Sequence, residues 1–540
     1  YADTPTDVLD TPWDFDTIWA INASINDGYP YLLWEDNTPP AVDAIDWIGG
    51  TTGALTDWNT ASNWSTNTVP TITDNVIIPD TANDPVIGPD VIAQVHNLTL
   101  ETDATLTIQS NAGYTGTLIV TGASTGNVTV ERHLKGERWY IIGPPVVDQG
   151  ISGLLTDESN NIAYDSATEN YGATDYNEAD NKWNAYFKAT TIGNFINGAG
   201  YLLRRGELAG AGLVSFVGTL QTGPVSQPVT TDGFRWNAVG NPYTSAIGVT
   251  GNATSPNNFL FVNANNLDAA HRAIYIWDDD IEKNYVIVNS ANFSNYPTLN
   301  TDYIQLGQGF IVRAAGLGNE VVFTPDMRVG QPALMLKSPI MDKMKAAPLT
   351  RQTKTQWPGV VLRATVNNGA DAASAGIAFY EGMTLGLDPG YDAGVFQGNP
   401  EVVVYTQLAA GDDGEDYGLQ CLPPSAMDWI TLDIGLETRR TGTVTFRFEK
   451  SDLPQGTVLI LEDQKQKTQK TIVSSSDTYT TVVDASEPAY GRFYLSFSDD
   501  PNAPPESPND PTDDRADENK SSSSGCFIGT VFSSAAASNR

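Results

Sequence analysis

The strongest constraint on the fold is a period-two alternation of apolar and polar residues in short runs. These runs recur about every ten residues, with Gly, Asn and Asp between them, which is typical of strands joined by turns. They include Leu98-Leu100, Leu118-Val120, Val128-Val130 and Val444-Phe446-Phe448. Long helices need runs of Ala, Leu, Glu and Lys, and the chain has almost none of these. The pattern therefore predicts an all-β protein, and the 540 residues suffice for several domains with their own cores.

Charge narrows the classes of partner. From Tyr1 to Glu131 there is no Lys or Arg, yet this stretch carries eighteen of the acidic residues in a chain of net charge −36. Such a surface cannot neutralise phosphates, so we expect neither nucleic acid nor anionic lipid as a partner. No apolar run approaches the roughly 20 residues that span a bilayer, so we expect no membrane span. We predict an extracellular or cell-surface location, with a leader removed or Tyr1 lying inside a longer precursor.

The amino-terminal part divides into two segments. Residues 1–44 contain WDFDTIWAINASINDGYPYLLWED, which resembles the end of the GLUG-type repeat regions of bacterial surface adhesins. Residues 45–132 carry short strands with the spacing of β-solenoid rungs or of a small sandwich. They also resemble the segment that precedes the next module in many exported Bacteroidetes proteins.

Two larger β modules follow. Residues 133–330 hold ERWYIIGPPV, GFRWNAVGNPYTSAI and LGQGFIVRA in this order, which resembles a β-sandwich module of proteins exported by type IX secretion. Residues 331–356 read as a linker. Residues 357–498 carry about eight alternating strands, which predicts a jelly-roll-like sandwich and resembles the module that precedes a sorting domain. The expected fold class is thus all-β: serial β-solenoid and β-sandwich modules, a jelly-roll-like carboxy-terminal sandwich and an extended tail.

The carboxy-terminal tail suggests an attachment device. Residues 499–525 form an acidic tether rich in Pro and Ser, and residues 526–540 begin GCFIGTVF, which resembles the CFI-box motif of some bacterial exported proteins. Cys526 has two interpretations, a point of processing or covalent anchoring, or simply part of a β-prone end. In the second case the arm adds as a strand to an open sheet edge of a neighbouring subunit. The candidate attachment residues are Cys526, Phe527, Ile528, Val531 and Phe532.

Signals of catalysis and of transition-metal binding are weak. His96, His133 and His271 have no metal-spaced His or Cys neighbour, and we assign all three to structural or surface roles. No nucleophile elbow, phosphate-binding loop or dinucleotide fingerprint is present, so we predict no enzyme activity. Calcium is the more credible ion, because clustered carboxylates in turns supply oxygen ligands. The candidate ligands are Asp278, Asp279, Asp280, Asp388, Asp392, Asp412 and Asp413.

Aromatic residues leave one alternative open. Six tryptophans lie in the first 64 residues, either as core residues or as exposed faces that stack on sugar rings, and we favour the core. Cys421 is expected to be a buried small hydrophobe. We predict a non-catalytic structural protein, an adhesin stalk or a subunit of a surface fibre built by strand addition. Its partners would be other copies of itself, head to tail, or cell-surface glycans and proteins. The alternative is the carbohydrate-binding portion of a secreted polysaccharide-degrading system.

Overall fold

The computed structural model is mostly β-structure, with several sheets and a few short helices. The structure describes residues 19–20, 29–32, 44–206, 212–250, 257–278, 284–290, 303–316, 320–330, 357–366, 369, 371–396, 401–411 and 414–498. Across these residues, no helix has the length and apolar character needed to cross a membrane. The prediction of a β-rich, multi-sheet protein is therefore confirmed.

Residues 45–132, here called the coil module, contain parallel ladders in which each later strand pairs with a strand from the preceding turn of the chain. One ladder joins β3 (Ile45–Asp46), β4 (Asn75–Ile78), β7 (Asn97–Leu100) and β10 (Ser124–Thr125). A second joins β5 (Val86–Ile87), β8 (Thr107–Ile108) and β11 (Val128–His133). A third joins β6 (Ile92–Val95) to β9 (Thr117–Val120). From β4 to β9 the chain visits the three ladders in turn, twice.

The alternating sequence explains why these short strands form. In β4 the side chains of Val76 and Ile78 are buried while those of Asn75 and Ile77 are partly exposed, and β7 alternates in the same way. The ladders pair buried residues with each other, as Val76 with Leu98. Stacked apolar side chains therefore fill the interior and fix the register, because a slip by one residue would expose the whole set.

Three tryptophans close one part of this core. Trp47, Trp58 and Trp64 are at most 1% exposed, and their rings meet edge to face with centroids 4.7–4.9 Å apart. The indole Nε1 of Trp47 donates to the carbonyl of Asn83, and that of Trp64 donates to the carbonyl of Trp58. The prediction that these tryptophans are core residues is confirmed. Trp13 and Trp34 lie outside the described residues.

Residues 133–330, here called the central module, hold several small antiparallel sheets. β11 enters this module directly, because it pairs with β8 on one side and with β18 on the other. The first group of elements is β12 (Trp139–Ile142), α1 (Ile151–Thr156), β13 (Tyr164–Asp165), β14 (Asn170–Tyr171), β15 (Ala173–Asn177), β16 (Lys182–Trp183), β17 (Tyr201–Arg204), β18 (Leu213–Gly218) and β19 (Val225–Pro228). The second is β20 (Trp236–Gly240), β21 (Ala246–Gly248), α2 (Phe259–Val262), β22 (Ala273–Asp278), β23 (Asn284–Asn289), β24 (Tyr303–Ile304), β25 (Gly309–Arg313), β26 (Glu320–Phe323) and β27 (Arg328–Val329).

The coil module also docks onto the central module from the side. The backbone N–H of Leu118 donates to the carbonyl of Thr244, whose hydroxyl donates back to the carbonyl of Leu118 at 2.8 Å. Arg328 Nη1 donates to the carbonyl of Val120, and its guanidinium lies over the ring of Tyr243. Strand β9 is thus fixed to the central module by contacts from two separate segments.

Residues 357–498, here called the C-terminal barrel, form one nearly closed, barrel-like sheet. Ten strands follow the order β36-β35-β38-β33-β31-β32-β29-β28-β34-β37, and β30 (Ala393–Gly394) pairs with β32 beside this path. The ten are β28 (Gly359–Val366), β29 (Asp371–Phe379), β31 (Val402–Thr406), β32 (Tyr417–Leu422), β33 (Thr431–Thr438), β34 (Gly442–Ser451), β35 (Val458–Asp463), β36 (Thr468–Ile472), β37 (Thr478–Val483) and β38 (Phe493–Ser498). Alternate side chains from these strands fill a single core, with Phe446, Phe448 and Leu495 fully buried.

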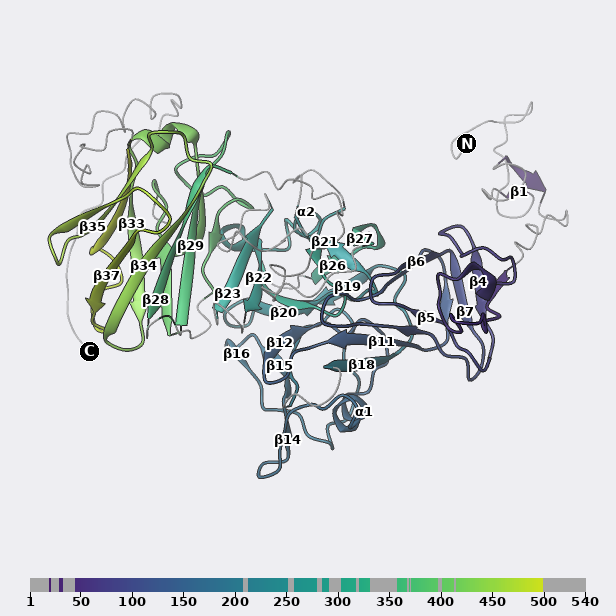
Figure 1. Cartoon of the computed structure of the whole chain (residues 1–540). Coiled ribbons are helices and arrows are strands. Elements are labelled where there is room, and N and C mark those ends of the chain that lie inside the picture. The colour runs from purple at the N-terminus through teal and green to yellow at the C-terminus, as the bar shows by residue number, and fades with distance from the viewer. Residues whose placement is uncertain are drawn as a thin grey trace, which may run out of the picture.

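Figure 1 shows these parts in series. The parallel ladders around β4 and β7 and the C-terminal barrel around β28 and β34 lie at opposite ends, with the central module between them. Separate from them, β1 (Trp19–Ala20) and β2 (Tyr31–Leu32) form a two-stranded antiparallel pair. The remaining helices are 3-10 turns, among them η3 (Ala269–His271) and η7 (Pro424–Asp428).

Candidate functional site

The central module and the C-terminal barrel meet at an aromatic contact. Phe396, which follows β30 of the barrel, packs against Trp236 of β20 with ring centroids 4.6 Å apart. It also packs edge to face against Tyr285 of β23, with centroids 4.5 Å apart. Trp236 in turn packs against Tyr275 of β22, whose hydroxyl donates to the carbonyl of Gly394 at 2.6 Å. We call this contact and the charged residues beside it the junction.

A buried charged cluster lies next to these rings. His271, at the end of η3, is 1% exposed, and its Nδ1 lies 2.9 Å from a carboxylate oxygen of Asp268. Arg313 Nη1, from β25, lies 2.7 Å from His271 Nδ1 and 3.0 Å from Nε2. The same Nη1 is 3.1 Å from Glu415, which belongs to the barrel. An ion pair therefore crosses from the central module to the barrel beside the histidine.

Glycine permits this close approach. A Cβ atom built on Gly394 would lie 2.2 Å from His271 Nε2, far inside van der Waals contact. Likewise, a Cβ on Gly418 of β32 would lie 2.3 Å from Ile287 Cδ1 of β23. The absence of a side chain at both positions lets the barrel approach the central module this closely.

Arg235 supports the same cluster from a constrained turn. Its Nη1 lies 2.8 Å from Asp268, and its backbone has a positive φ of 66°, which is uncommon for a residue with a side chain. The buried carboxylate of Glu178 holds this turn by accepting the backbone N–H groups of Asp232, Gly233 and Arg235. The constrained backbone is thus compensated by charge-assisted hydrogen bonds.

The electrostatics of the cluster follow from burial and pairing. Burial alone would disfavour the charge on Asp268, but the hydrogen bond from His271 and the charges of Arg313 and Arg235 lower its pKa to about 2. Burial is the main cause that lowers the pKa of His271, and the Arg313 charge adds to it, while Asp268 opposes both. We therefore treat His271 as neutral and Asp268 as ionised at neutral pH.

The charged residues of this cluster pair with one another, and most of their side-chain surface is shielded from solvent. Their side chains are 1% exposed at His271, 14% at Asp268, 15% at Arg313 and 35% at Glu415. The cluster thus joins the two modules through contacts that are mostly buried. The sequence alone predicts only a structural or surface role for His271. The spacing of three residues between Asp268 and His271 is a local sign that the two can pair. Glu415, which pairs with Arg313, is too far along the chain to be inferred from sequence.

Three of the predicted calcium ligands lie within the described residues. Asp278 is buried at the end of β22. Asp388 accepts the backbone N–H of Thr384, and buried Asp392 accepts those of Asp388 and Cys421. Asp279, Asp280, Asp412 and Asp413 lie outside the described residues. Within the described part of the chain, no group of three or more His, Cys, Asp or Glu side chains is placed to hold a metal ion.

The two cysteines also differ in what can be said of them. Cys421 is fully buried, and its thiol donates to the carbonyl of Tyr391, which confirms the prediction of a buried small residue. Cys526 and the other candidate attachment residues of the tail lie outside the described residues.

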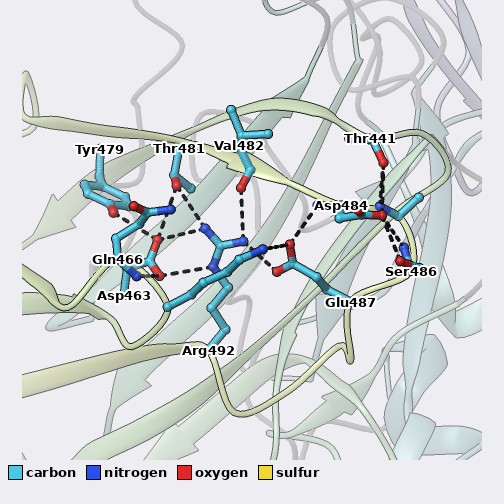
Figure 2. A network of polar contacts seen from close by, with 12 residues as sticks. Thr441, Asp463, Gln466, Tyr479, Thr481, Val482, Asp484, Ser486, Glu487 and Arg492 are labelled. Atoms are coloured by element: carbon cyan, nitrogen blue, oxygen red, sulfur yellow. Dashed lines mark hydrogen bonds and ion pairs between the residues drawn. The ribbon is translucent and has the colours of Figure 1, made fainter.

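A second buried ionic network lies inside the barrel. Arg492 donates from Nε and Nη2 to the two carboxylate oxygens of Asp463, at 3.1 and 2.9 Å, and from Nη1 to Glu487 at 2.6 Å. Tyr479 and Thr481 of β37 donate to Asp463, the last residue of β35. Figure 2 shows Arg492 between the two carboxylates. Because β35 and β37 lie towards opposite ends of the strand order, this network links the two margins of the sheet.

One protein-family model matches nearly all of the residues described above. Residues 47–135 and 122–497 match the family model of a domain of unknown function, DUF8693. The chain belongs to the DUF8693 family. The matched region of this DUF8693 protein includes the coil module, the junction and the barrel network. Neither a search of curated proteins nor a search of solved structures found a match.

Proposed function

We propose that this DUF8693 protein is a non-catalytic extracellular structural protein, an adhesin stalk or a subunit of a surface fibre. The observation that carries the proposal is the pair of packed contacts that join its modules in series. β9 is held by Thr244 and Arg328, and the barrel is held by the Phe396 and Glu415 contacts. Contacts of this kind transmit force and orientation between modules, which is what a stalk requires.

The proposal includes a finer view of the fold. We interpret the coil module as a short β-solenoid, because parallel ladders with one strand per turn of chain are the mark of that architecture. The C-terminal barrel is interpreted as a jelly-roll-like sandwich that is nearly closed on itself. The resemblance to exported Bacteroidetes surface proteins supports a cell-surface location, as does the acidic amino-terminal stretch.

Assembly is assigned to the carboxy-terminal arm. Residues 526–532 are apolar and β-prone, and they follow a tether of 499–525 that is too polar to bury a core. Added to a sheet edge of the next copy, such an arm forms a head-to-tail contact that need not close and so builds a fibre.

Deletion of residues 521–540 tests this assignment. We expect filaments of the full chain in negative-stain images and only single particles of the deleted chain. A Cys526→Ser variant is the matched control, because it leaves the β-prone arm intact and removes the thiol. Filaments lost in both chains would indicate covalent anchoring, and filaments retained after deletion would refute any role for the arm.

Calcium binding is retained as a separate proposal for the Asp-rich turns. Asp388 and Asp392 lie close to each other in one loop, since the backbone N–H of Asp388 donates to Asp392 at 2.6 Å. If an ion binds there or near Asp278, addition of Ca²⁺ will raise the thermal midpoint by mass action and EDTA will reverse the rise. An unchanged midpoint with millimolar Ca²⁺ would contradict this proposal.

One observation favours carbohydrate binding as a second candidate. The buried Trp47, Trp58 and Trp64 do not provide the exposed faces that this alternative needs, but the barrel has a different aromatic group. Trp357 and Tyr380 stack with ring centroids 4.0 Å apart, Tyr391 lies beside them, and Tyr380 is 41% exposed. A partly exposed aromatic group of this kind can pack against the apolar face of a sugar. Glycan-array binding that disappears in Tyr380→Ala, and persists in Tyr186→Ala elsewhere on the surface, would favour it.

A further inference from the structure

The position of Arg313 relative to His271 favours a neutral imidazole. Arg313 Nη1 lies within 3.0 Å of both ring nitrogens, and Arg313 can only donate. With Nδ1–H donating to Asp268, the neutral ring keeps its lone pair on Nε2, which lies 3.0 Å from this donor. An imidazolium has N–H groups on both nitrogens, so it would face the guanidinium with like charge and with no acceptor.

The two carboxylates that face His271 favour an added charge, but each is also bound by an arginine, and burial outweighs them. Asp268, in its own turn, is already bonded to Arg235 as well as to the ring. From the barrel, Glu415 is 3.7 Å from Nε2 but is bound more closely by Arg313. The backbone of Gly394 in β30 lies against the ring of His271. The ring of Trp236 packs against the imidazole and against the ring of Tyr275. Arg272, the next residue in the chain, lies against Gly390 of the barrel. With His271 neutral, the charges of Arg313 and Arg235 match those of Asp268 and Glu415, and Arg272 already adds a further positive charge nearby.

This balance is located at the contact between two modules. Arg313 contacts the ring and also makes the ion pair to Glu415, so any displacement of Arg313 affects the pair that crosses the junction. The ring itself is in close contact with Gly394. We propose that His271 is a pH-sensitive element of the junction, and that its protonation in mild acid loosens the C-terminal barrel from the central module. This inference does not depend on assembly by the carboxy-terminal arm.

The direction of the effect follows from linkage. Burial lowers the pKa of His271 in the folded chain below its ordinary value of 6.5. As the pH falls below 6.5, an opened junction takes up a proton before the closed junction does. Closure is therefore fully favoured above pH 6.5, and it weakens as the pH falls towards the folded pKa of the histidine. Asp268, with a pKa of about 2, stays ionised throughout this window.

The chain is well suited to a direct test, because it has only three histidines. Hydrogen exchange of the full chain, measured at pH 7 and pH 5 and corrected for intrinsic rates, reports opening of the junction. We expect residues 393–396 and 268–275 to lose protection at pH 5 while β34 in the barrel core keeps it. In His271→Gln the amide remains neutral, and protection of these segments is expected to be the same at both pH values. His96→Gln, at an exposed histidine, is the matched control and should behave like the wild type.

A second measurement keeps the inference testable if His271→Gln does not fold. The histidine ring signals of the wild-type chain, followed by NMR from pH 8 to pH 4, give three titration curves. We expect two curves to titrate below the ordinary histidine value, because burial lowers the pKa of both His271 and His133. The curve that persists in His133→Gln belongs to His271, and junction protection should be lost over its pH range. Equal protection at both pH values in the wild type, or an unchanged pH response in a folded His271→Gln, would overturn the inference.

Discussion

At the scale of single residues, the junction depends on glycines that leave room for close contact as well as on the side chains that make the contact. Gly394 allows the barrel backbone to contact the His271 ring directly. This ring cannot retreat easily, because Trp236 packs against it with ring centroids 5.2 Å apart and its nitrogens contact Asp268 and Arg313. Tight cores respond to added volume with strain, since there are few voids to receive it.

We predict that Gly394→Ala lowers stability by about 1–3 kcal/mol, because the new methyl group overlaps the imidazole. Denaturant unfolding followed by tryptophan fluorescence measures the change. Gly153→Ala is the control: Gly153 lies in α1 with open space at its Cβ, and alanine should stabilise the helix by about 0.5–1 kcal/mol. A neutral Gly394→Ala would show that the ring moves freely.

At the scale of elements, the barrel is held by backbone ladders along most of its path and by side chains across its margins. Asp463 ends β35, Tyr479 and Thr481 come from β37, and Arg492 immediately precedes β38. Asp463 is 0% and Arg492 7% exposed, so both charges are removed from water and depend on each other. Figure 2 shows the same arginine reaching Glu487 and the backbone of Val482.

Arg492→Met should destabilise the barrel by about 3–5 kcal/mol, because it leaves the carboxylate of Asp463 buried without its counter-charge. Chemical denaturation of the variant and the wild type gives the difference. Arg440→Met is the matched control, since Arg440 is 82% exposed and 3.9 Å from Glu401, and its loss should cost less than about 1 kcal/mol. Similar losses in both variants would contradict this account of the network.

The same network predicts an acid response distinct from that of His271. Burial opposes ionisation of Asp463, but the hydrogen bonds from Arg492, Gln466 and Tyr479 and the charge of Arg492 together outweigh it, so the pKa lies below its ordinary value of 3.8. The stabilisation by this ion pair is therefore fully present above pH 3.8 and is lost as the pH falls through the folded pKa. Thermal midpoints between pH 6 and pH 2 should fall in this acid range for the wild type. The fall should be smaller in Asp463→Asn, and equal falls would contradict the assignment.

At the scale of the whole molecule, neighbouring modules are joined by shared strands and packed side chains. The coil module shares β11 with the central module, and the central module shares an aromatic contact with the barrel. Figure 1 shows the resulting series from the parallel ladders to the barrel. Coupling of this kind makes the unfolding of one module sensitive to its neighbour.

Phe396→Ala should uncouple the barrel from the central module, because this 4% exposed ring contacts Trp236, Tyr275 and Tyr285. We expect a loss of about 3–5 kcal/mol of junction stability, and calorimetry should show separate transitions where the wild type shows a coupled one. Phe234→Ala, at a phenylalanine that is 53% exposed, is the control and should cost less than about 0.5 kcal/mol. Identical scans for the two variants would rule out Phe396 as a coupling residue.

Much of the β-structure could be predicted because alternation is a local property of the chain. Val444, Phe446 and Phe448 alternate in sequence and do form one buried face of β34. The tryptophans at 47, 58 and 64 were correctly placed in a core, since aromatic residues between short strands have few other partners. The near closure of the barrel was not predicted, because it depends on which strands pair. The candidate calcium residues were chosen by local clustering, which does not report where a carboxylate points.

The sequence by itself determined the β-class of the chain, its acidic amino-terminal surface and the burial of Cys421, because these follow from composition and from neighbouring residues. Only the tertiary structure brought His271 to Glu415 and Arg492 to Asp463, and only it identified Gly394 as a contact position. Each of these pairs joins segments that no local pattern relates. The physical reason is that burial and charge pairing act between surfaces, and those surfaces exist only after the strands have assembled.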